Sequence, residues 1–208
     1  MQPELICVEG NIGIGKTTLV KKLADYLRVP AFYEEFEENP WLPLFYRQPR
    51  QTALSLEISF LTDRVRQLNT VRKKYPETRL VSDYCLDKCL LFAAVNLSKQ
   101  DFARYKKLHE AVAATVLQPA LVVVIHSRVE NLQQNIRRRN RSYEQNMEDA
   151  YLQKLNEAYK EFFTQERSYR ILNIFSAQLN EETYERIFPE ITAFLKMQPS
   201  AKNTSLEL

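Results

Sequence analysis

The chain contains only three glycines, Gly10, Gly13 and Gly15, and they fall within six of its 208 positions. They lie in the segment LICVEGNIGIGKTTLV, residues 5–20, between an apolar stretch and an amphipathic one. Together with the Lys-Thr pair that follows, they satisfy the phosphate-loop pattern G-x-x-x-x-G-K-[ST] in the strand-then-helix context that the pattern requires. A strand that turns sharply into a helix needs residues that tolerate positive φ. The sequence therefore predicts a phosphate-binding turn near the N-terminus.

This turn has the groups needed to hold the phosphates of a nucleotide. Its backbone N–H groups and the N-terminus of the next helix point at the anion, Lys16 adds a positive charge, and the Thr17 hydroxyl can bind Mg²⁺. A backbone that wraps a phosphate closely cannot carry Cβ atoms at the points of contact. The predicted phosphate-binding residues are Gly10, Asn11, Ile12, Gly13, Ile14, Gly15, Lys16, Thr17 and Thr18.

Apolar segments alternate with amphipathic ones along the whole chain, which predicts an α/β fold. Strands separated by helices pair in parallel, with helices covering both faces of the sheet. We therefore expect a P-loop kinase fold with a five-stranded parallel sheet. The expected strands are 4–9, 31–36, 79–83, 120–127 and 169–175, and the expected helices are 16–28, 50–74, 85–117, 129–139, 147–165 and 181–197.

Length and composition favour one domain. Residues 1–197 are expected to form it, because a chain of this size can bury one sizeable core. The tail, residues 198–208, has few apolar side chains and is expected to be flexible. Lys and Arg number 29 against 26 Asp and Glu, a balance that argues against a general nucleic-acid or membrane binder.

The N-terminus lacks the pattern of a secretion signal, and no run of about 18 apolar residues occurs. The three cysteines, Cys7, Cys85 and Cys89, are an odd number with no paired framework, as expected where thiols stay reduced. No His or further Cys lies near Cys85 and Cys89 to complete a metal site. We expect a cytoplasmic protein whose cysteines are buried and structural.

Acidic residues end two of the expected strands. Glu34 and Glu35 end the second strand and Asp83 ends the third. Successive strand side chains face opposite ways, so only one of the two glutamates can point into a site. That carboxylate can accept the proton of an attacking hydroxyl, while Asp83 and Thr17 are the predicted ligands of Mg²⁺, the expected cofactor with ATP. The alternative for these acids is a solvated acidic surface.

Arginines are concentrated in NIRRRNRSYEQN, residues 135–146, directly after an expected helix. We expect this segment to form a lid that closes over the transferring phosphate, where cationic side chains are worth about 10³ to 10⁵ in rate. An arginine cluster is also compatible with nucleic-acid binding or with a solvated surface. The phosphate-loop pattern favours the lid.

The remaining motifs restrict the kind of phosphate chemistry. GTPases need a guanine-binding N-K-x-D motif and a D-x-x-G switch, and neither follows the third strand. The helicase-type motifs of larger ATPase motors are also missing. A small kinase remains, with donor and acceptor at the carboxyl ends of the strands.

Four segments together resemble the deoxyribonucleoside kinase family, and most nearly its bacterial deoxyadenosine and deoxyguanosine kinases. They are GNIGIGKTTL, YEEFEENPWLPLFYRQP, the strand end VSD and RRRNRSYE, in the order and approximate spacing of the family. The resemblance extends to about residue 176. It implies transfer of the γ-phosphate of ATP to the 5′-hydroxyl of a deoxynucleoside by a homodimer, with no nucleic-acid or membrane partner.

The resemblance also implies roles for individual residues. Glu34 matches the general base of the family, with Glu35 the alternative if the alignment shifts by one. Glu57 matches a position that is usually a glutamine hydrogen-bonded to the base. The other matched positions are Tyr46 and Glu144 for the sugar 3′-hydroxyl, Arg64 beside the base, and Arg137, Arg139 and Arg141 for the phosphates; Lys16 and Asp83 complete the predicted site.

Two positions depart from the family pattern. Where the family has Asp/Glu-Arg-Ser after the third strand, this chain has Asp83, Tyr84 and Cys85, so an arginine that supports the base and the phosphate is missing. We expect slower catalysis, or compensation by Arg64 or a lid arginine.

The second departure is Glu57, because an ionised carboxylate only accepts hydrogen bonds, whereas an amide also donates them. We expect Glu57 to stay ionised next to Arg64 and to favour guanine, and hence purine deoxynucleosides, over thymine. A protonated Glu57 suits adenine or cytosine instead.

Two other functions compete with this one. A nucleoside monophosphate kinase, such as a thymidylate kinase, must neutralise an acceptor phosphate, typically with an arginine near the third strand, and here Tyr84 and Cys85 occupy that place. A kinase-like subunit that binds nucleotide without turnover is the other alternative, favoured by the same missing arginine.

Overall fold

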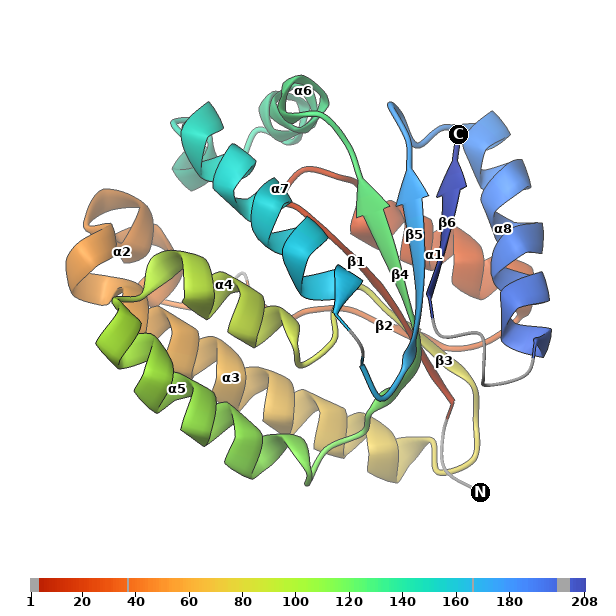
Figure 1. Cartoon of the computed structure of the whole chain (residues 1–208), viewed down its shortest axis with the longest axis horizontal. Coiled ribbons are helices and arrows are strands. Elements are labelled where there is room, and N and C mark those ends of the chain that lie inside the picture. Colours follow the sequence, from red (N-terminus) through yellow and green to blue (C-terminus); the bar gives the residue numbers. More distant parts are fainter. Residues whose placement is uncertain (1–3, 37, 166, 198–202) are drawn as a thin grey trace.

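A parallel sheet forms the centre of the computed structural model, which describes residues 4–36, 38–165, 167–197 and 203–208. The sheet has six strands in the order β2-β3-β1-β4-β5-β6 (Figure 1). All neighbouring strands pair in parallel, so their carboxyl ends meet at one edge, where ligands bind in open α/β sheets. The strands are β1 (Leu5–Gly10), β2 (Ala31–Phe32), β3 (Leu80–Ser82), β4 (Pro119–His126), β5 (Arg170–Phe175) and β6 (Asn203–Glu207).

Helices cover both faces of the sheet. In Figure 1, α1 and α8 lie on one side, and α3, α4, α5 and α7 lie on the other. Two hydrophobic clusters correspond to these two layers. The helices are α1 (Lys16–Leu27), α2 (Trp41–Arg47), α3 (Pro49–Lys74), α4 (Lys88–Asn96), α5 (Lys99–Ala113), α6 (Val129–Arg139), α7 (Asp149–Thr164) and α8 (Glu181–Lys196), with a short 3₁₀ turn η1 (Ser142–Glu144).

The central strands are apolar because both of their faces are covered. Along β1, Leu5 and Cys7 pack toward α3, α4 and α7, while Ile6 and Val8 pack toward α1 and α8. All residues of β1 are buried. This double burial explains why the strand shows no alternation of polar and apolar residues. It also places the end of β1, and the turn that follows, in the middle of the sheet.

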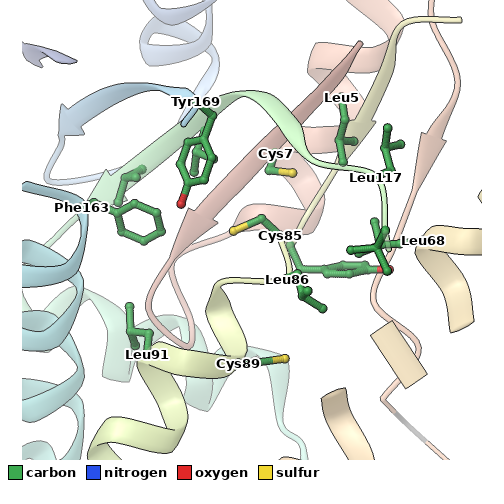
Figure 2. Close-up of a cluster of buried hydrophobic side chains, with 14 of the residues drawn as sticks. Leu5, Cys7, Leu68, Cys85, Leu86, Cys89, Leu91, Leu117, Phe163 and Tyr169 are labelled. Carbon is green, nitrogen blue, oxygen red and sulfur yellow. The ribbon is translucent and has the colours of Figure 1, made fainter. Parts of the chain in front are cut away.

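The three cysteines are free and buried, as expected. Figure 2 shows Cys7, Cys85 and Cys89 among leucine and aromatic side chains, including Leu91 and Phe163. Burial raises the pKa of all three thiols. Within the described residues no group of three or more His, Cys, Asp or Glu side chains could hold a metal ion, and no helix is long and apolar enough to cross a membrane.

Three regions differ from the sequence prediction. The second strand, expected at 31–36, is only β2, so the chain leaves the sheet before the two glutamates. The helix expected at 85–117 is two helices, α4 and α5, and α5 begins where the Ser98 side chain accepts a hydrogen bond from the Asp101 N–H. The short helix α2 was not predicted. Pro189 lies inside α8, which continues through it although proline disfavours the interior of a helix.

The sheet has a sixth strand where a flexible tail was expected. Of the tail at 198–208, residues 198–202 lie outside the described residues, and Asn203–Glu207 form β6 beside β5. The Leu208 N–H donates to the carbonyl of Phe175 at 3.0 Å. The expectation of a flexible tail is therefore wrong for 203–207. The segment is polar, but β5 offers it a row of unpaired backbone groups, and those hydrogen bonds do not depend on side chains.

Deleting residues 203–208 is expected to lower the free energy of unfolding by about 1 to 3 kcal/mol, because several sheet hydrogen bonds and the packing of Leu206 are lost. Chemical denaturation of the full and shortened chains measures the difference. Leu206→Ala should reproduce part of the loss, while Ser205→Ala, at an exposed position of the same strand, should not. Equal stability of the full and shortened chains would show that β6 does not form in solution.

Candidate active site

Contacts within the protein explain two of the three glycines. Gly13 has φ +82°, and a Cβ there would lie 2.7 Å from the carbonyl oxygen of Leu132 in α6. At Gly10 a Cβ would lie 2.7 Å from the carbonyl oxygen of Ile125 in β4. Neither neighbour is a flexible side-chain end that can move aside. The close approach of the turn to β4 and α6 thus requires glycine at both positions, whether or not a phosphate is bound.

Asn11 fixes the turn to α7. Its side-chain amide donates to the carbonyl of Leu152 at 2.9 Å and to Asn156 Oδ1 at 2.8 Å, and its Oδ1 accepts the Ile12 N–H at 2.7 Å. Asn11 was predicted to bind phosphate, but its side chain is engaged by α7. Its contribution is to hold the backbone of the turn in place.

Lys16 lies at the start of α1 with its ammonium group folded onto the turn. Nζ donates to the carbonyl oxygens of Gly10 and Asn11 at 2.8 and 3.0 Å. Burial and the nearby Lys88 lower the pKa of Lys16 to about 8. A bound anion would stabilise the charged form, so the site favours a ligand with negative charge.

A cavity of about 610 Å³ extends from the turn past β2 and β3 to α2, α3, α4 and α7. Its size is that of a small-molecule site. Gly10, Asn11 and Arg137 are not among its lining residues, and Arg137 is exposed. The predicted residues that do line it are Ile12, Gly13, Ile14, Gly15, Lys16, Thr17, Thr18, Glu34, Tyr46, Glu57, Arg64, Asp83, Arg139, Arg141 and Glu144.

Asp83 connects the phosphate turn to the end of β2. Its Oδ2 accepts a hydrogen bond from the Thr17 hydroxyl at 2.8 Å, and its Oδ1 accepts one from the Glu34 N–H at 2.8 Å. Mg²⁺ is usually held by one or two protein oxygens together with phosphate oxygens and water. A hydroxyl and a carboxylate in contact beside a phosphate-binding turn fit that donor set.

Glu34 is buried between two cations. Arg64 of α3 donates to its Oε1 through Nε at 2.8 Å and through Nη2, and Lys88 of α4 donates to its Oε2 at 2.6 Å. Burial alone would raise the pKa of Glu34, but Arg64 and Lys88 outweigh it and lower the pKa to about 2. Glu34 is thus ionised and held in one orientation within the cavity.

Glu35 points the other way. Its side chain is 68% exposed and lies 3.6 Å from Arg66 on the outer surface of α3. Of the two adjacent glutamates, only Glu34 lines the cavity. The expectation that one of them faces the site is met by Glu34.

Glu57 lines the same cavity, whose lining also includes the aromatic residues Phe45, Phe60, Phe92 and Tyr151. Its Oε1 accepts a hydrogen bond from Asn96 Nδ2 at 2.7 Å, and its Oε2 is buried with no hydrogen-bond partner among the described residues. Burial raises the pKa of Glu57 from 4.5 to about 7, against the opposing effects of Asn96 and Arg64. Arg64 lowers the pKa but does not hold Glu57 fully ionised at neutral pH, which corrects the expectation from sequence.

The geometry of Arg64 explains that error. Its guanidinium group donates to Glu34 and, through Nη1, to Cys89 Sγ at 2.8 Å. The hydrogen bonds of Arg64 thus go to Glu34 and Cys89, and Glu57 receives its one hydrogen bond from a neutral amide.

The predicted lid, residues 135–146, begins within the last part of α6 (Val129–Arg139), so Arg137 and Arg139 are helical and only the segment after Arg139 is a loop with η1. Arg139 pairs with the buried Glu144, and Arg141 lies 3.7 Å from the same carboxylate and 4.5 Å from the ring of Phe36. Two aromatic rings complete the contact, since Tyr46 of α2 stacks on Tyr143 of η1 at 5.8 Å. Arg138, in place of the predicted Arg137, also lines the cavity.

The sequence profile of the deoxynucleoside kinases matches residues 6–196 of this chain. The chain belongs to the deoxynucleoside kinase family. It is 31% identical over 160 residues to deoxyguanosine kinase from Bacillus subtilis, an alignment that covers 74% of this chain and 76% of that one. It is 30% identical over 159 residues to deoxyadenosine kinase from Lactobacillus acidophilus, covering 72% and 73%. A structure of deoxyadenosine kinase from M. mycoides with dCMP and dCDP bound superposes with a TM-score of 0.80 at 26% identity, over 91% of this chain and 99% of that one.

The family resemblance inferred from the four segments is confirmed. This deoxynucleoside kinase is a phosphotransferase, and the comparisons favour it over the monophosphate kinase and the subunit without turnover.

Lys88 is the residue of this kinase that the sequence analysis missed. Tyr84, at the position of the missing arginine, is fully buried and donates its hydroxyl to Gln67, away from Glu34. Lys88 begins α4 four residues later, is 6% exposed and reaches Glu34 in its place. The sequence does show a lysine four residues after the position of the missing arginine. Recognising its role required knowing that α4 begins there, which the sequence pattern did not predict.

Replacing Glu57 with Gln should stabilise this kinase more at high pH than at low pH. Folding raises the pKa of Glu57. Its contribution to the free energy of unfolding is therefore complete below the unfolded-state pKa of 4.5 and is lost as the pH rises through the folded-state pKa of about 7. Glu57→Gln removes this loss, so its effect on the free energy of unfolding should become about 2 to 3 kcal/mol more favourable between about pH 5 and pH 8.5. Denaturant unfolding at both pH values measures it, and the exposed Glu35→Gln, which should show no such change, is the control.

Proposed function

We propose that this kinase transfers the γ-phosphate of ATP to the 5′-hydroxyl of a deoxynucleoside, with purine deoxynucleosides favoured. The observation that carries the proposal is that one cavity joins the phosphate turn, a buried carboxylate and an aromatic pocket. The turn suits a polyphosphate, the carboxylate suits a hydroxyl, and the aromatic end suits a flat base. Named relatives that phosphorylate deoxyguanosine or deoxyadenosine support the purine preference.

Glu34 is the proposed general base. In the absence of ligands, Arg64 and Lys88 keep its pKa near 2, which makes it a weak proton acceptor. A bound polyphosphate competes for the same two cations. When Arg64 and Lys88 shift part of their interaction from Glu34 to the phosphate, the pKa of Glu34 rises. The carboxylate therefore becomes a better acceptor for the 5′-hydroxyl proton when ATP is bound.

The cations of the phosphate turn and the lid are proposed to neutralise the transferring group. Lys16 exchanges its hydrogen bonds with the carbonyl oxygens of the turn for hydrogen bonds with the phosphate. Arg138, Arg139 and Arg141 line the same cavity and neutralise charge on the transferring group. Arg137, which is exposed and outside the lining, has the weakest support among the predicted arginines.

Thr17 and Asp83 are the proposed protein ligands of Mg²⁺. When bound, the ion supplies neutralisation of charge on the β- and γ-phosphates. Tyr46 and Glu144 are proposed to bind the sugar, since both line the cavity between the lid and α2. A sugar in contact with them would link binding of the acceptor to closure of the residue 135–146 lid.

A homodimer and a cytoplasmic location stay proposals. Exposed apolar side chains on neighbouring helices support the dimer, because a monomer rarely exposes several of them together. They are Leu54 and Ile58, one turn apart on α3, and Leu108 on α5.

A phosphorylation panel tests the proposed function. The four deoxynucleosides and their monophosphates are incubated with ATP and Mg²⁺, and nucleotide products are measured. We expect deoxyguanosine and deoxyadenosine to be phosphorylated, monophosphates not, and Glu34→Gln to lower kcat by about 10² to 10⁴. Glu35→Gln should keep the wild-type rate. Turnover of monophosphates alone, or equal rates for Glu34→Gln and the wild type, would contradict the proposal.

Lys88→Met tests the compensation for the missing arginine. Loss of this cation should raise the pKa of Glu34 and lower kcat by about 10² or more, as for other groups that stabilise charge at a reacting centre. Because the ionised form is the active one, the acidic limb of the pH–rate profile should move to higher pH. Lys88→Arg should restore part of the rate, and Lys107→Met, at an exposed position of α5, serves as the control. An unshifted acidic limb would remove Lys88 from the mechanism.

A further inference from the structure

Glu57 is a buried carboxyl group in the cavity with one oxygen left without a partner. The residue is 1% exposed, and its Oε2 has no hydrogen-bond partner within the described part of the chain. Such a group is costly to bury unless a ligand completes its hydrogen bonds. Because Glu57 lies among the cavity's aromatic side chains, the ligand group that meets it is expected to be part of a flat ring.

The orientation of the carboxyl group is fixed by a chain of two hydrogen bonds. Tyr151 of α7 donates to Asn96 Oδ1 at 3.1 Å, so the Asn96 amide nitrogen faces Glu57 and donates to its Oε1 at 2.7 Å. Oε1 can still accept one more hydrogen bond, but it does not carry a proton while Asn96 donates to it. When Glu57 is protonated, the proton therefore lies on Oε2.

We propose that Glu57 selects the base of the deoxynucleoside through its own protonation state, the ionised form binding guanine and the protonated form binding adenine. This rests on the proposed function, since it assigns the base of the same acceptor. Asn96 is a positioning residue in this scheme, because it acts on the base only through Glu57.

The hydrogen bonds balance in both states. The pairing edge of guanine carries two neighbouring donors, N1–H and the N2 amino group, and an ionised Glu57 accepts both, one on each oxygen. The pairing edge of adenine carries an acceptor at N1 beside the N6 amino donor. A protonated Glu57 donates from Oε2 to N1 and accepts the amino group on Oε1. In this register, an ionised Glu57 meets the N1 acceptor of adenine with a second acceptor, and the proton of a protonated Glu57 meets the N1–H donor of guanine. A buried mismatch of this kind is strongly unfavourable.

The surroundings of Glu57 support a proton exchange near neutral pH. Burial and Glu34 favour the protonated form, and Asn96, Arg64 and Lys88 favour the ionised form, giving a pKa of about 7. The aromatic hydroxyls and the thiol that face Glu57 keep their protons at this pH, because burial raises their pKa values. The titratable and charged groups around it are Arg64 on its own helix, Glu34 after β2, Lys88 and Cys89 on α4, Tyr105 on α5 and Tyr151 on α7.

The pH dependence of the substrate ratio tests the inference. kcat/KM for deoxyguanosine and for deoxyadenosine is measured with ATP and Mg²⁺ between about pH 5.5 and pH 8.5, a range in which Glu57 should titrate. Their ratio cancels effects of pH on the donor, on Glu34 and on the lid, which both substrates share. We expect the ratio of deoxyguanosine to deoxyadenosine to rise by up to about tenfold per pH unit. A ratio constant within about twofold across the range would overturn the inference.

Two variants distinguish titration of Glu57 from other causes. Glu57→Gln carries both a donor and an acceptor at every pH, so its ratio should lose its pH dependence. Asn96→Ala removes a hydrogen bond that favours the ionised form, so the ratio should change at higher pH than in the wild type. Glu35→Gln should retain the wild-type curve. A pH-dependent ratio that persists in Glu57→Gln would assign the titration to another group.

Failure of the inference can be separated from failure of the proposed function. Phosphorylation of both nucleosides with a constant ratio leaves the kinase activity in place and refutes only the role of Glu57. If neither nucleoside is phosphorylated, the proposed function has failed, and calorimetric binding of the two nucleosides at the same pH values then decides the inference. A ¹³C NMR titration of the glutamate carboxyl groups, with the Glu57 signal identified by its loss in Glu57→Gln, measures the pKa independently of turnover.

Discussion

The site depends on one buried ion cluster, in which Glu34 is held by Arg64 and Lys88. Glu34 lies in the segment after β2, Arg64 in α3 and Lys88 in α4, so the cluster joins three segments that are distant in sequence. Burying an ion is very costly unless it is paired and hydrogen-bonded, so removal of Glu34 would leave two buried cations without the carboxylate that they share. This constraint fixes where α3 and α4 lie relative to the sheet. It also keeps Glu34 within reach of the phosphate turn, to which Asp83 connects it.

The parts of the fold that sequence predicted are those set by local patterns. The glycine-containing turn, β1 and β4 follow from strand apolarity and from the spacing of Gly13 and its neighbours. β6 was missed because its sequence NTSLE is polar, and α2 because it is only seven residues long and contains Pro43. β6 forms because β5 offers it a backbone edge, and α2 packs Phe45 into a small cluster with Ala53 and Leu56 of α3. Tertiary contacts decide both elements.

The same distinction applies to the site. Glu34, Arg64 and the lid arginines could be expected from motifs at fixed spacing. The role of Lys88 could not, because it depends on the turn between β3 and α4, where Tyr84 points inward to Gln67. The ionisation of Glu57 was wrong for a related reason. Arg64 follows Glu57 by seven residues on the same helix, but this spacing does not reveal that Arg64 donates its hydrogen bonds to Glu34 and Cys89.

Arg64 therefore couples the two ends of the cavity. Since its hydrogen bonds go to Glu34, the proposed base is ionised and no cation among the described residues is hydrogen-bonded to Glu57, whose pKa is about 7. A polyphosphate that draws Arg64 toward the turn would raise the pKa of both carboxyl groups, because both lose favourable interaction with the same cation. Binding of the donor then favours protonated Glu57, and with it adenine over guanine. The chemistry of the phosphate end and the choice of base at the other end are in this way two consequences of one shared guanidinium group.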